Sequence, residues 1–398
     1  MRAQMVKWIG LVLWLWIAFA HGAAAQDQDG AVAQTSMTFS DCIDKLSAVD
    51  SGWCEMRVPG SKPGISAVWP DVNRRIRQVA GPSAVLTAWN SAAYDPVDRY
   101  LYFMGGGHAD YGGNEVYRFE LDSGTWRRLT DPSPLDYYTA SRGGHSFWIP
   151  DTDRVPGAFH TYDGLLFLPA TRTLLALSLG PANGARVDPG EPLDRTRLKA
   201  DGGGPRQYEF NPSLVDLRNG LPPLQWRLLG TRDWGYPRSA VLPDNTLVLG
   251  SKTRLYRAQL VAGKLEVLSQ FSSQADSGDG TLVYDAAREL LWSMHAKVLL
   301  AFARTGRLVK KLPPPNRAKS IAISTDGRLV TWDGGALVSV LDPDDPAPHW
   351  SVTDWGAQGP TAAHSGRVYE KWQHVGDNLF VGVSTDQHGV WLFKLAPR

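Results

Sequence analysis

Short apolar runs alternate with turn residues along most of the chain, and no stretch after residue 40 shows the period of a long amphipathic helix. The clearest unit has apolar or alternating runs at residues 86–94, 100–104, 115–121 and 125–129. Asp, Pro, Ser and Gly separate these runs, and such residues favour turns. The pattern therefore predicts a four-stranded antiparallel meander over residues 86–129.

Within this unit, the run at 100–104 leads into Gly105-Gly106-Gly107, and Tyr117 and Trp126 follow on the next two runs. This order of an apolar run, a glycine cluster, a Tyr and a Trp resembles the kelch repeat, the blade of the β-propeller in the central domain of galactose oxidase and its relatives. The resemblance implies a tight turn at the glycines and packing of Tyr117 and Trp126 between blades. The chain thus resembles kelch-type propeller proteins of the bacterial secretory kind.

Weaker copies of the unit follow, with first strands expected near residues 88, 160, 236, 280, 320 and 369. The compact copies lie 40 to 50 residues apart, near the kelch period of about 50, and longer spacings before the second and third copies imply insertions. The last copy has three strands, and a spare strand at 65–69 is expected to close the ring.

We therefore predict an all-β chain, with one six-bladed β-propeller over residues 57–398 that is closed by an N-terminal outer strand. A seven-bladed propeller is the alternative if residues 144–149 belong to a degenerate blade. A β-sandwich is the competing fold.

The first 25 residues are predicted to be a signal peptide, because Arg2 and Lys7 precede or flank an apolar run over 8–20 and residues 23–25 are all Ala. That run has 13 residues, fewer than the roughly 20 that span a bilayer, which disfavours a membrane anchor. Residues 26–56 are expected to form a lead-in segment. We expect an exported protein, in the periplasm or the medium, without membrane attachment after cleavage.

Cys42 and Cys54 are the two cysteines of the chain. In an oxidising compartment they should form a local disulfide, and two free thiols are the alternative. The formal net charge of +1 provides no basic field for nucleic acid. No coiled coil or partner-binding tail is visible, so a monomer is expected.

In a propeller, the loops between second and third strands and the connections between blades meet at one end, and long loops on a rigid scaffold commonly carry function. The catalytic candidates on these loops are His108, His160, Tyr162 and Tyr208. The substrate-binding candidates are Tyr111, Asn114, His145, Arg206, Arg238, Lys371 and His388. Structural roles remain the alternative, since tyrosines pack between blades and arginines form surface ion pairs.

No GxSxG, P-loop or HExxH motif occurs. A copper radical oxidase of the galactose oxidase kind requires a Cys crosslinked to a Tyr inside the propeller, and neither cysteine is placed for that. No cofactor is expected. A divalent metal ion bound by His108, His145 and His160 is kept as an alternative.

Our first functional hypothesis is a polysaccharide lyase acting on uronate-containing polysaccharides or oligosaccharides. Elimination needs a base, an acid and a cation for the carboxylate, which His, Tyr and Arg can supply. A non-catalytic glycan- or protein-binding propeller is the first alternative. A glycoside hydrolase is the second, with candidate carboxylates at Asp110, Glu115, Asp163 and Glu370.

Overall fold

The computed structural model describes residues 37–57, 64–72, 74–77, 79–107, 110–133, 139–140, 147–148, 156–177, 207–214, 226–230, 232, 234–251, 253–272, 280–295, 297–315, 320–361, 368–386 and 389–398. Four candidate site residues, His108, His145, Arg206 and His388, lie outside these ranges, as does the predicted signal peptide.

Six four-stranded antiparallel sheets form the blades of a β-propeller, which confirms the predicted fold. Blade 1 holds β2 (Ala92–Asp95), β3 (Tyr100–Phe103), β4 (Tyr117–Glu120) and β5 (Thr125–Arg128), and blade 2 holds β8 (Leu165–Leu168), β9 (Thr173–Leu177), β10 (Gln207–Phe210) and β11 (Arg227–Gly230). Blade 3 holds β12 (Arg238–Val241), β13 (Leu247–Gly250), β14 (Arg254–Val261) and β15 (Lys264–Ser272), and blade 4 holds β16 (Gly280–Asp285), β17 (Leu290–His295), β18 (Val298–Ala303) and β19 (Leu308–Leu312). Blade 5 holds β20 (Ala322–Ile323), β21 (Leu329–Trp332), β22 (Leu337–Leu341) and β23 (Trp350–Asp354), and blade 6 holds β24 (Trp372–Gly376), β25 (Leu379–Gly382), β26 (Val390–Lys394) and β1 (Gly52–Met56).

The remaining elements are short. They are the helices α1 (Phe39–Ser47), α2 (Arg74–Arg77) and α3 (Ala84–Thr87), the 3₁₀ turns Ile65–Val68, Gly81–Ser83, Pro212–Leu214 and Gly356–Gln358, and the two-stranded ribbon of β6 (Thr139–Ala140) and β7 (Phe147–Trp148). Part of the segment considered for a seventh blade lies in this ribbon. None of the helices within the described ranges is long and apolar enough to cross a membrane.

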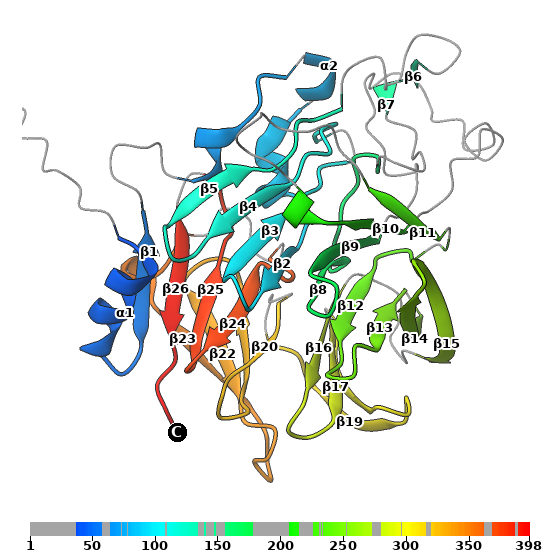
Figure 1. The fold of residues 1–398 in the computed structure, drawn as a ribbon. Coiled ribbons are helices and arrows are strands. Elements are labelled where there is room, and N and C mark those ends of the chain that lie inside the picture. Colours follow the sequence, from blue (N-terminus) through cyan, green and yellow to red (C-terminus); the bar gives the residue numbers. More distant parts are fainter. Residues whose placement is uncertain are drawn as a thin grey trace, which may run out of the picture. The chain divides into compact units, whose positions relative to one another are not determined.

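The first strands of successive blades contact one another, from β2 to β8, β12, β16, β20 and β24. They are therefore the innermost strands of the propeller. The sheets follow one another in sequence order, and β24 to β26, in red, lie beside the blue β1 (Figure 1). Because strands alternate in direction, the start of each first strand lies at the same end as the loop between the second and third strands. We call this end the loop end.

The ring is closed by an N-terminal outer strand, as predicted, but by a different segment. β1 pairs antiparallel with β26, from Gly52 opposite Lys394 to Met56 opposite Val390. The segment predicted to close the ring instead forms the 3₁₀ turn Ile65–Val68, whose Val68 carbonyl oxygen accepts a 2.8 Å hydrogen bond from Arg128. A short apolar run does not by periodicity alone distinguish a strand from a helical turn.

The predicted Cys42–Cys54 disulfide is present, with the two Cα atoms 5.5 Å apart. It joins α1 to the closing strand β1, and both cysteines are buried. Helix α1 begins with a capping box, in which Thr38 and Asp41 exchange hydrogen bonds with each other's backbone N–H groups. The lead-in therefore contains a helix and supplies a strand of the propeller. A disulfide is consistent with an oxidising compartment.

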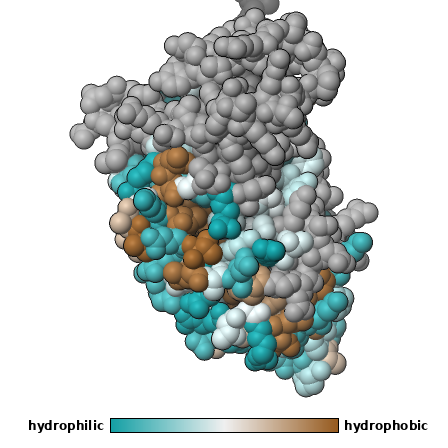
Figure 2. Space-filling view, turned by 90° about the vertical axis from the view of Figure 1, so that its right-hand side faces the viewer, coloured by the Kyte–Doolittle hydropathy of each residue, from teal (hydrophilic) through white to brown (hydrophobic). Residues whose placement is uncertain are grey.

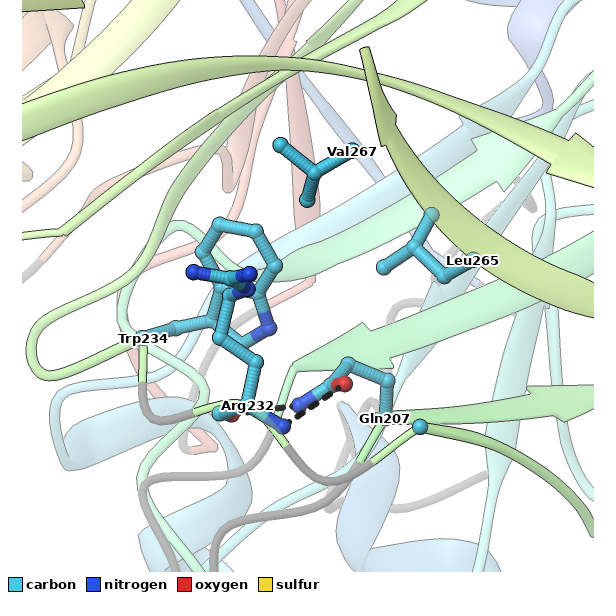
Figure 3. A pocket seen from close by; sticks show the side chains of 6 residues that line it. Gln207, Arg232, Trp234, Leu265 and Val267 are labelled. Carbon is cyan, nitrogen blue, oxygen red and sulfur yellow. Dashed lines mark hydrogen bonds between the residues drawn. The ribbon is translucent and has the colours of Figure 1, made fainter. Parts of the chain in front are cut away.

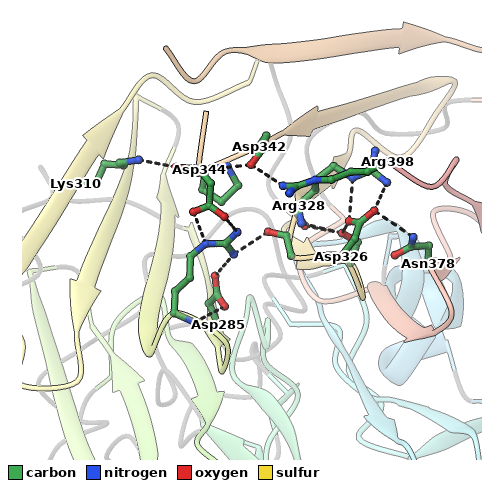
Figure 4. Close-up of polar contacts among 12 residues, drawn as sticks. Asp285, Lys310, Asp326, Arg328, Asp342, Asp344, Asn378 and Arg398 are labelled. Atoms are coloured by element: carbon green, nitrogen blue, oxygen red, sulfur yellow. Dashed lines mark hydrogen bonds and ion pairs between the residues drawn. The ribbon is translucent and has the colours of Figure 1, made fainter. Parts of the chain in front are cut away.

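Ion pairs join the turns of blades 4, 5 and 6 at the end opposite the loop end (Figure 4). Arg288 bonds Asp285 of its own blade at 2.8 Å and Asp344 of blade 5 at 2.5 Å. Asp326 of blade 5 forms an ion pair with Arg328 at 2.6 Å. The hydrogen bond and the charge of Arg328 help to lower the pKa of Asp326 to about 2, although burial opposes this shift. This network supports the blades that flank the closing strand.

Aromatic and aliphatic side chains fill the space between the sheets. Trp53 of β1, Trp332 of β21 and Trp372 of β24 lie 5.4 to 5.8 Å apart between ring centroids and hold blades 5 and 6 together. On the outer strands, Leu268 and Val352 are each 53% exposed. Hydrophobic patches alternate with hydrophilic ones on the face seen in Figure 2.

Candidate functional site

Three tyrosines from three blades meet at the loop end. Tyr162, Tyr236 and Tyr369 each precede the first strand of a blade, namely β8, β12 and β24. The ring of Tyr162 contacts that of Tyr236 at 4.9 Å and that of Tyr369 at 5.8 Å between centroids. Tyr369 is fully buried and Tyr162 is 6% exposed, whereas Tyr236 is partly exposed. We call these residues the tyrosine cluster.

All three tyrosines have left-handed backbone conformations, with φ of 48° at Tyr162, 57° at Tyr236 and 44° at Tyr369. Bulky residues rarely adopt positive φ, which costs about 1–3 kcal/mol per residue and persists only where the surroundings enforce it. Such strain is concentrated at functional sites. Its recurrence at equivalent positions in three blades therefore marks the cluster as a candidate site.

His160 lies beside the tyrosine cluster and contacts a carboxylate from the neighbouring blade. Its Nε2 is 3.2 Å from Oδ2 of Asp110, which belongs to the loop between β3 and β4. Its ring centroid lies 5.8 Å from that of Tyr162 and 5.0 Å from that of Trp89. A hydrogen bond from Nε2–H to the Asp110 carboxylate would select the tautomer in which Nδ1 is the basic nitrogen.

A pair of carboxyl groups lies next to the cluster in sequence and in space. Asp163 of blade 2 and Glu370 of blade 6 are in hydrogen-bond contact. Burial first, and then the charge of Glu370, raise the pKa of Asp163 well above its ordinary value. Burial also raises the pKa of Glu370 to about 7, although its contact with Asp163 opposes the shift. Two such groups cannot readily ionise together, because each negative charge opposes the other.

Backbone and hydroxyl groups from other blades hold this pair. Oδ2 of Asp163 accepts hydrogen bonds from the backbone N–H groups of Leu282 at 2.9 Å and Ser239 at 3.3 Å. Glu370 accepts a bond from the Thr281 hydroxyl at 3.0 Å. The pair thus contacts the first strands of blades 3 and 4 as well as its own blades 2 and 6, and it fixes their spacing at the axis.

Arg238, predicted to bind substrate, is completely buried. Its guanidinium donates to Nε2 of His295 at 2.6 Å, to the Ser293 hydroxyl at 3.3 Å and to the backbone carbonyl oxygen of Ser251. Burial lowers its pKa to about 10, and the nearby Asp163 opposes that shift, so Arg238 stays charged at neutral pH. Its positive charge therefore acts on Asp163, while its donors are used within the protein.

Lys371, another predicted substrate ligand, also bonds inside the protein. Its ammonium group donates to the backbone carbonyl oxygens of Leu86 at 2.6 Å and Ala88 at 3.4 Å. The side chain is 2% exposed. Lys371 thereby ties blade 6 to the segment that precedes blade 1.

Two further candidates, Tyr111 and Asn114, lie inside the loop of blade 1. The hydroxyls of Tyr111 and Tyr117 both donate to Oε1 of Glu115, at 2.5 and 2.6 Å, and burial raises the pKa of this carboxyl. The amide of Asn114 donates to the Ser133 hydroxyl at 3.0 Å and to a backbone carbonyl oxygen. Their described contacts shape the loop that carries Asp110.

Tyr208 is separate from the tyrosine cluster in the described contacts. It is fully buried on β10 and meets Trp226 edge-on at 6.3 Å between ring centroids. The structure therefore brings together three of the predicted residues, His160, Tyr162 and Arg238. Sequence reasoning did not include Tyr236 and Tyr369 among the candidate site residues. The recurring Tyr two or three residues before a first strand was the available signal.

No group of three or more His, Cys, Asp or Glu residues in the described part of the chain is arranged to hold a metal ion. Two members of the suggested histidine set, His108 and His145, lie outside that part.

Known proteins with a similar structure share little sequence with this chain. No family model and no curated protein matches the sequence. A structural genomics protein of unknown function from Bacteroides thetaiotaomicron VPI-5482 aligns with a TM-score of 0.47 and 9% identity, over 86% of this chain and 76% of that one. Virginiamycin B lyase from Staphylococcus aureus aligns with a TM-score of 0.41 and 12% identity, over 77% of this chain and 94% of that one. The structure of YjhT aligns with a TM-score of 0.42 and 12% identity, over 66% of this chain and 83% of that one.

Proposed function

We propose that this chain is an exported, kelch-type propeller that acts on carbohydrate at its loop end, as a lyase of uronate-containing polysaccharides. The observation that carries the proposal is the contact of His160 with Asp110 beside Tyr162. It unites a base held by a carboxylate with a phenol that can act as an acid.

In the proposed elimination, one of these groups removes a proton from the substrate and the other donates a proton to the leaving oxygen. His160 removes the proton from the carbon next to the uronate carboxylate, and the electron pair forms a carbon–carbon double bond. The bond to the leaving oxygen breaks, and Tyr162 protonates that oxygen. The products are an unsaturated uronide at the new non-reducing end of one fragment and a new reducing end on the other. Proton exchange with solvent then returns His160 and Tyr162 to their starting protonation states.

Charge neutralisation is divided between two arginines in this proposal. Arg238 contributes only its positive charge, because its donors are engaged by His295, Ser293 and Ser251. Arg206 remains the proposed direct carboxylate ligand, since a guanidinium can bind a carboxylate through two hydrogen bonds. Tyr236 is partly exposed, and in this proposal its ring stacks on a sugar.

The carboxyl geometry supports a lyase over a glycoside hydrolase. Retaining hydrolases separate their two carboxyl groups by about 5–5.5 Å, and inverting ones by more. Asp163 is fully buried and interacts directly with Glu370, which does not fit two carboxyl groups placed on either side of a sugar.

The test is the near-ultraviolet absorbance of the purified mature protein with a panel of uronate polysaccharides, with and without chelator. Accumulation of an unsaturated product supports the lyase, and loss of the signal with chelator assigns a metal to it. Glycan binding without any product would instead support a binding propeller. New reducing ends without absorbance would support a hydrolase.

A further inference from the structure

A pocket lies between blades 2 and 3, and its lining shares no residue with the tyrosine cluster. Its volume is about 630 Å³, which falls within the roughly 300–1,000 Å³ of small-molecule sites. The lining residues, shown in Figure 3, are Gln207, Gly230, Arg232, Trp234, Leu265 and Val267. We call this feature the side pocket.

The one cation among these residues is stacked on two aromatic rings. The guanidinium carbon of Arg232 lies 5.1 Å from the ring centroid of Tyr256 and 5.9 Å from that of Trp234. Arg232 is exposed, and none of the ion pairs within the described ranges involves it. Stacking restricts the side chain before a ligand arrives, so less conformational entropy is lost when it binds an anion.

The backbone of Arg232 is also held in place. The Gln207 amide donates to its carbonyl oxygen at 2.5 Å and accepts from its N–H at 3.1 Å. Gln207 is 1% exposed. A Cβ on Gly230 would lie 2.8 Å from the Gln207 side-chain oxygen, so glycine leaves room for this clamp. The backbone that carries the Arg232 guanidinium is therefore fixed by the buried Gln207 side chain.

The opposite wall of the side pocket is aliphatic. Leu265 and Val267 project from β15 and are partly exposed (Figure 3). Gln207 is 1% exposed and each end of its amide bonds the Arg232 backbone, so it presents little polar surface to a polyhydroxylated ligand. Removing many hydroxyls from water without partners would be costly. An apolar body with one anionic group fits this lining better.

We propose that the side pocket binds a small monocarboxylate with an apolar body, of the aryl- or alkyl-carboxylate class. The carboxylate pairs with Arg232, and the apolar body lies against Leu265 and Val267. This inference is independent of the chemistry at the loop end.

Calorimetric titration of the mature protein with benzoate, and with neutral benzyl alcohol of similar size, tests the proposal. We expect benzoate to bind and benzyl alcohol to bind at least tenfold more weakly. Arg232→Gln should weaken benzoate binding at least tenfold. Arg254→Gln, which alters another exposed arginine on neighbouring β14, should leave it unchanged.

Val267→Glu provides a second variant, because its carboxylate would occupy the pocket and compete for Arg232. It should also abolish benzoate binding, and unchanged melting temperatures would show that both variants fold. Absence of benzoate binding to the parent protein overturns the proposal. So does equal binding of benzoate to the parent and to a folded Arg232→Gln variant.

Discussion

Nε2 of His160 lies 3.2 Å from Oδ2 of Asp110, although the two residues come from different blades. His160 precedes the first strand of blade 2, and Asp110 belongs to a loop of blade 1. The contact exists only when the two blades are packed side by side. The proposed base is therefore oriented by the assembly of the propeller.

Replacing Asp110 with Asn should lower the turnover of uronate polysaccharide on the order of 10²-fold, because the imidazole loses the carboxylate that fixes its tautomer. Steady-state kinetics at neutral pH measures the effect, and we expect a larger change in kcat than in KM. Asp122→Asn alters an exposed aspartate of the same blade and should leave turnover unchanged. Equal rates for the parent and Asp110→Asn would remove Asp110 from the proposed site.

Tyr162→Phe should retain the fold and lose most of the activity, since it keeps the ring contacts and removes only the acidic hydroxyl. Tyr208→Phe is the matched control, because Tyr208 lies on β10 against Trp226. The kcat of both variants on the same polysaccharide distinguishes the two tyrosines. If Tyr208→Phe loses the activity and Tyr162→Phe keeps it, the acid has been assigned to the wrong residue.

The Asp163–Glu370 pair should make stability fall as the pH rises. The pKa of Glu370 is about 7 in the folded protein and 4.5 ordinarily, so the folded state binds more protons between these values. By linkage, the contribution of Glu370 to the free energy of unfolding decreases from pH 4.5 to about 7 and is constant above that.

Glu370→Gln should flatten this part of the pH profile. Denaturant unfolding across the same pH window, with parent and variant compared, measures the contribution. Arg238, Thr281 and Gln373 surround the pair and are unchanged in the variant. Glu266→Gln, at an exposed position of β15, is the control. Parallel profiles for the parent and Glu370→Gln would show that the pKa of Glu370 is the same in the folded and the unfolded protein.

Reducing the Cys42–Cys54 disulfide should lower the free energy of unfolding by about 2–3 kcal/mol, because it frees a short loop in the unfolded chain. Since the bond joins α1 to β1, hydrogen exchange should rise first in β1 and its partner β26. Thermal unfolding and hydrogen exchange, with and without reductant, measure both effects. A Cys42→Ala/Cys54→Ala variant that is insensitive to reductant serves as the control. Unchanged exchange in β26 would show that closure does not depend on the bond.

Much of the fold could be predicted because each blade repeats a local pattern. The runs around residues 280–312 and 320–352 correspond to complete blades 4 and 5. Two elements were missed for a physical reason. β10 follows a long insertion, so no neighbouring run marked it as a third strand. β1, Gly-Trp-Cys-Glu-Met, pairs with a strand more than 330 residues away, and local patterning does not reveal that partner.

The site was less predictable because its contacts are made across the axis. The residue types of His160, Tyr162 and Arg238 indicated chemistry at the loop end. Whether each faces substrate depends on the blades around it. Arg238 was expected to meet a carboxylate directly, whereas His295 and Ser293 of blade 4 occupy its donors.

The most direct test of the central claim compares His160→Asn with His374→Asn in the absorbance assay on uronate polysaccharide. His374 lies on β24 against Phe380 and outside the tyrosine cluster, so its replacement controls for the loss of an imidazole. The account expects His160→Asn to lose on the order of 10²- to 10⁴-fold in rate, the usual contribution of a general base, while His374→Asn keeps the parent rate. Unsaturated product formed at the parent rate by a folded His160→Asn variant would contradict the account.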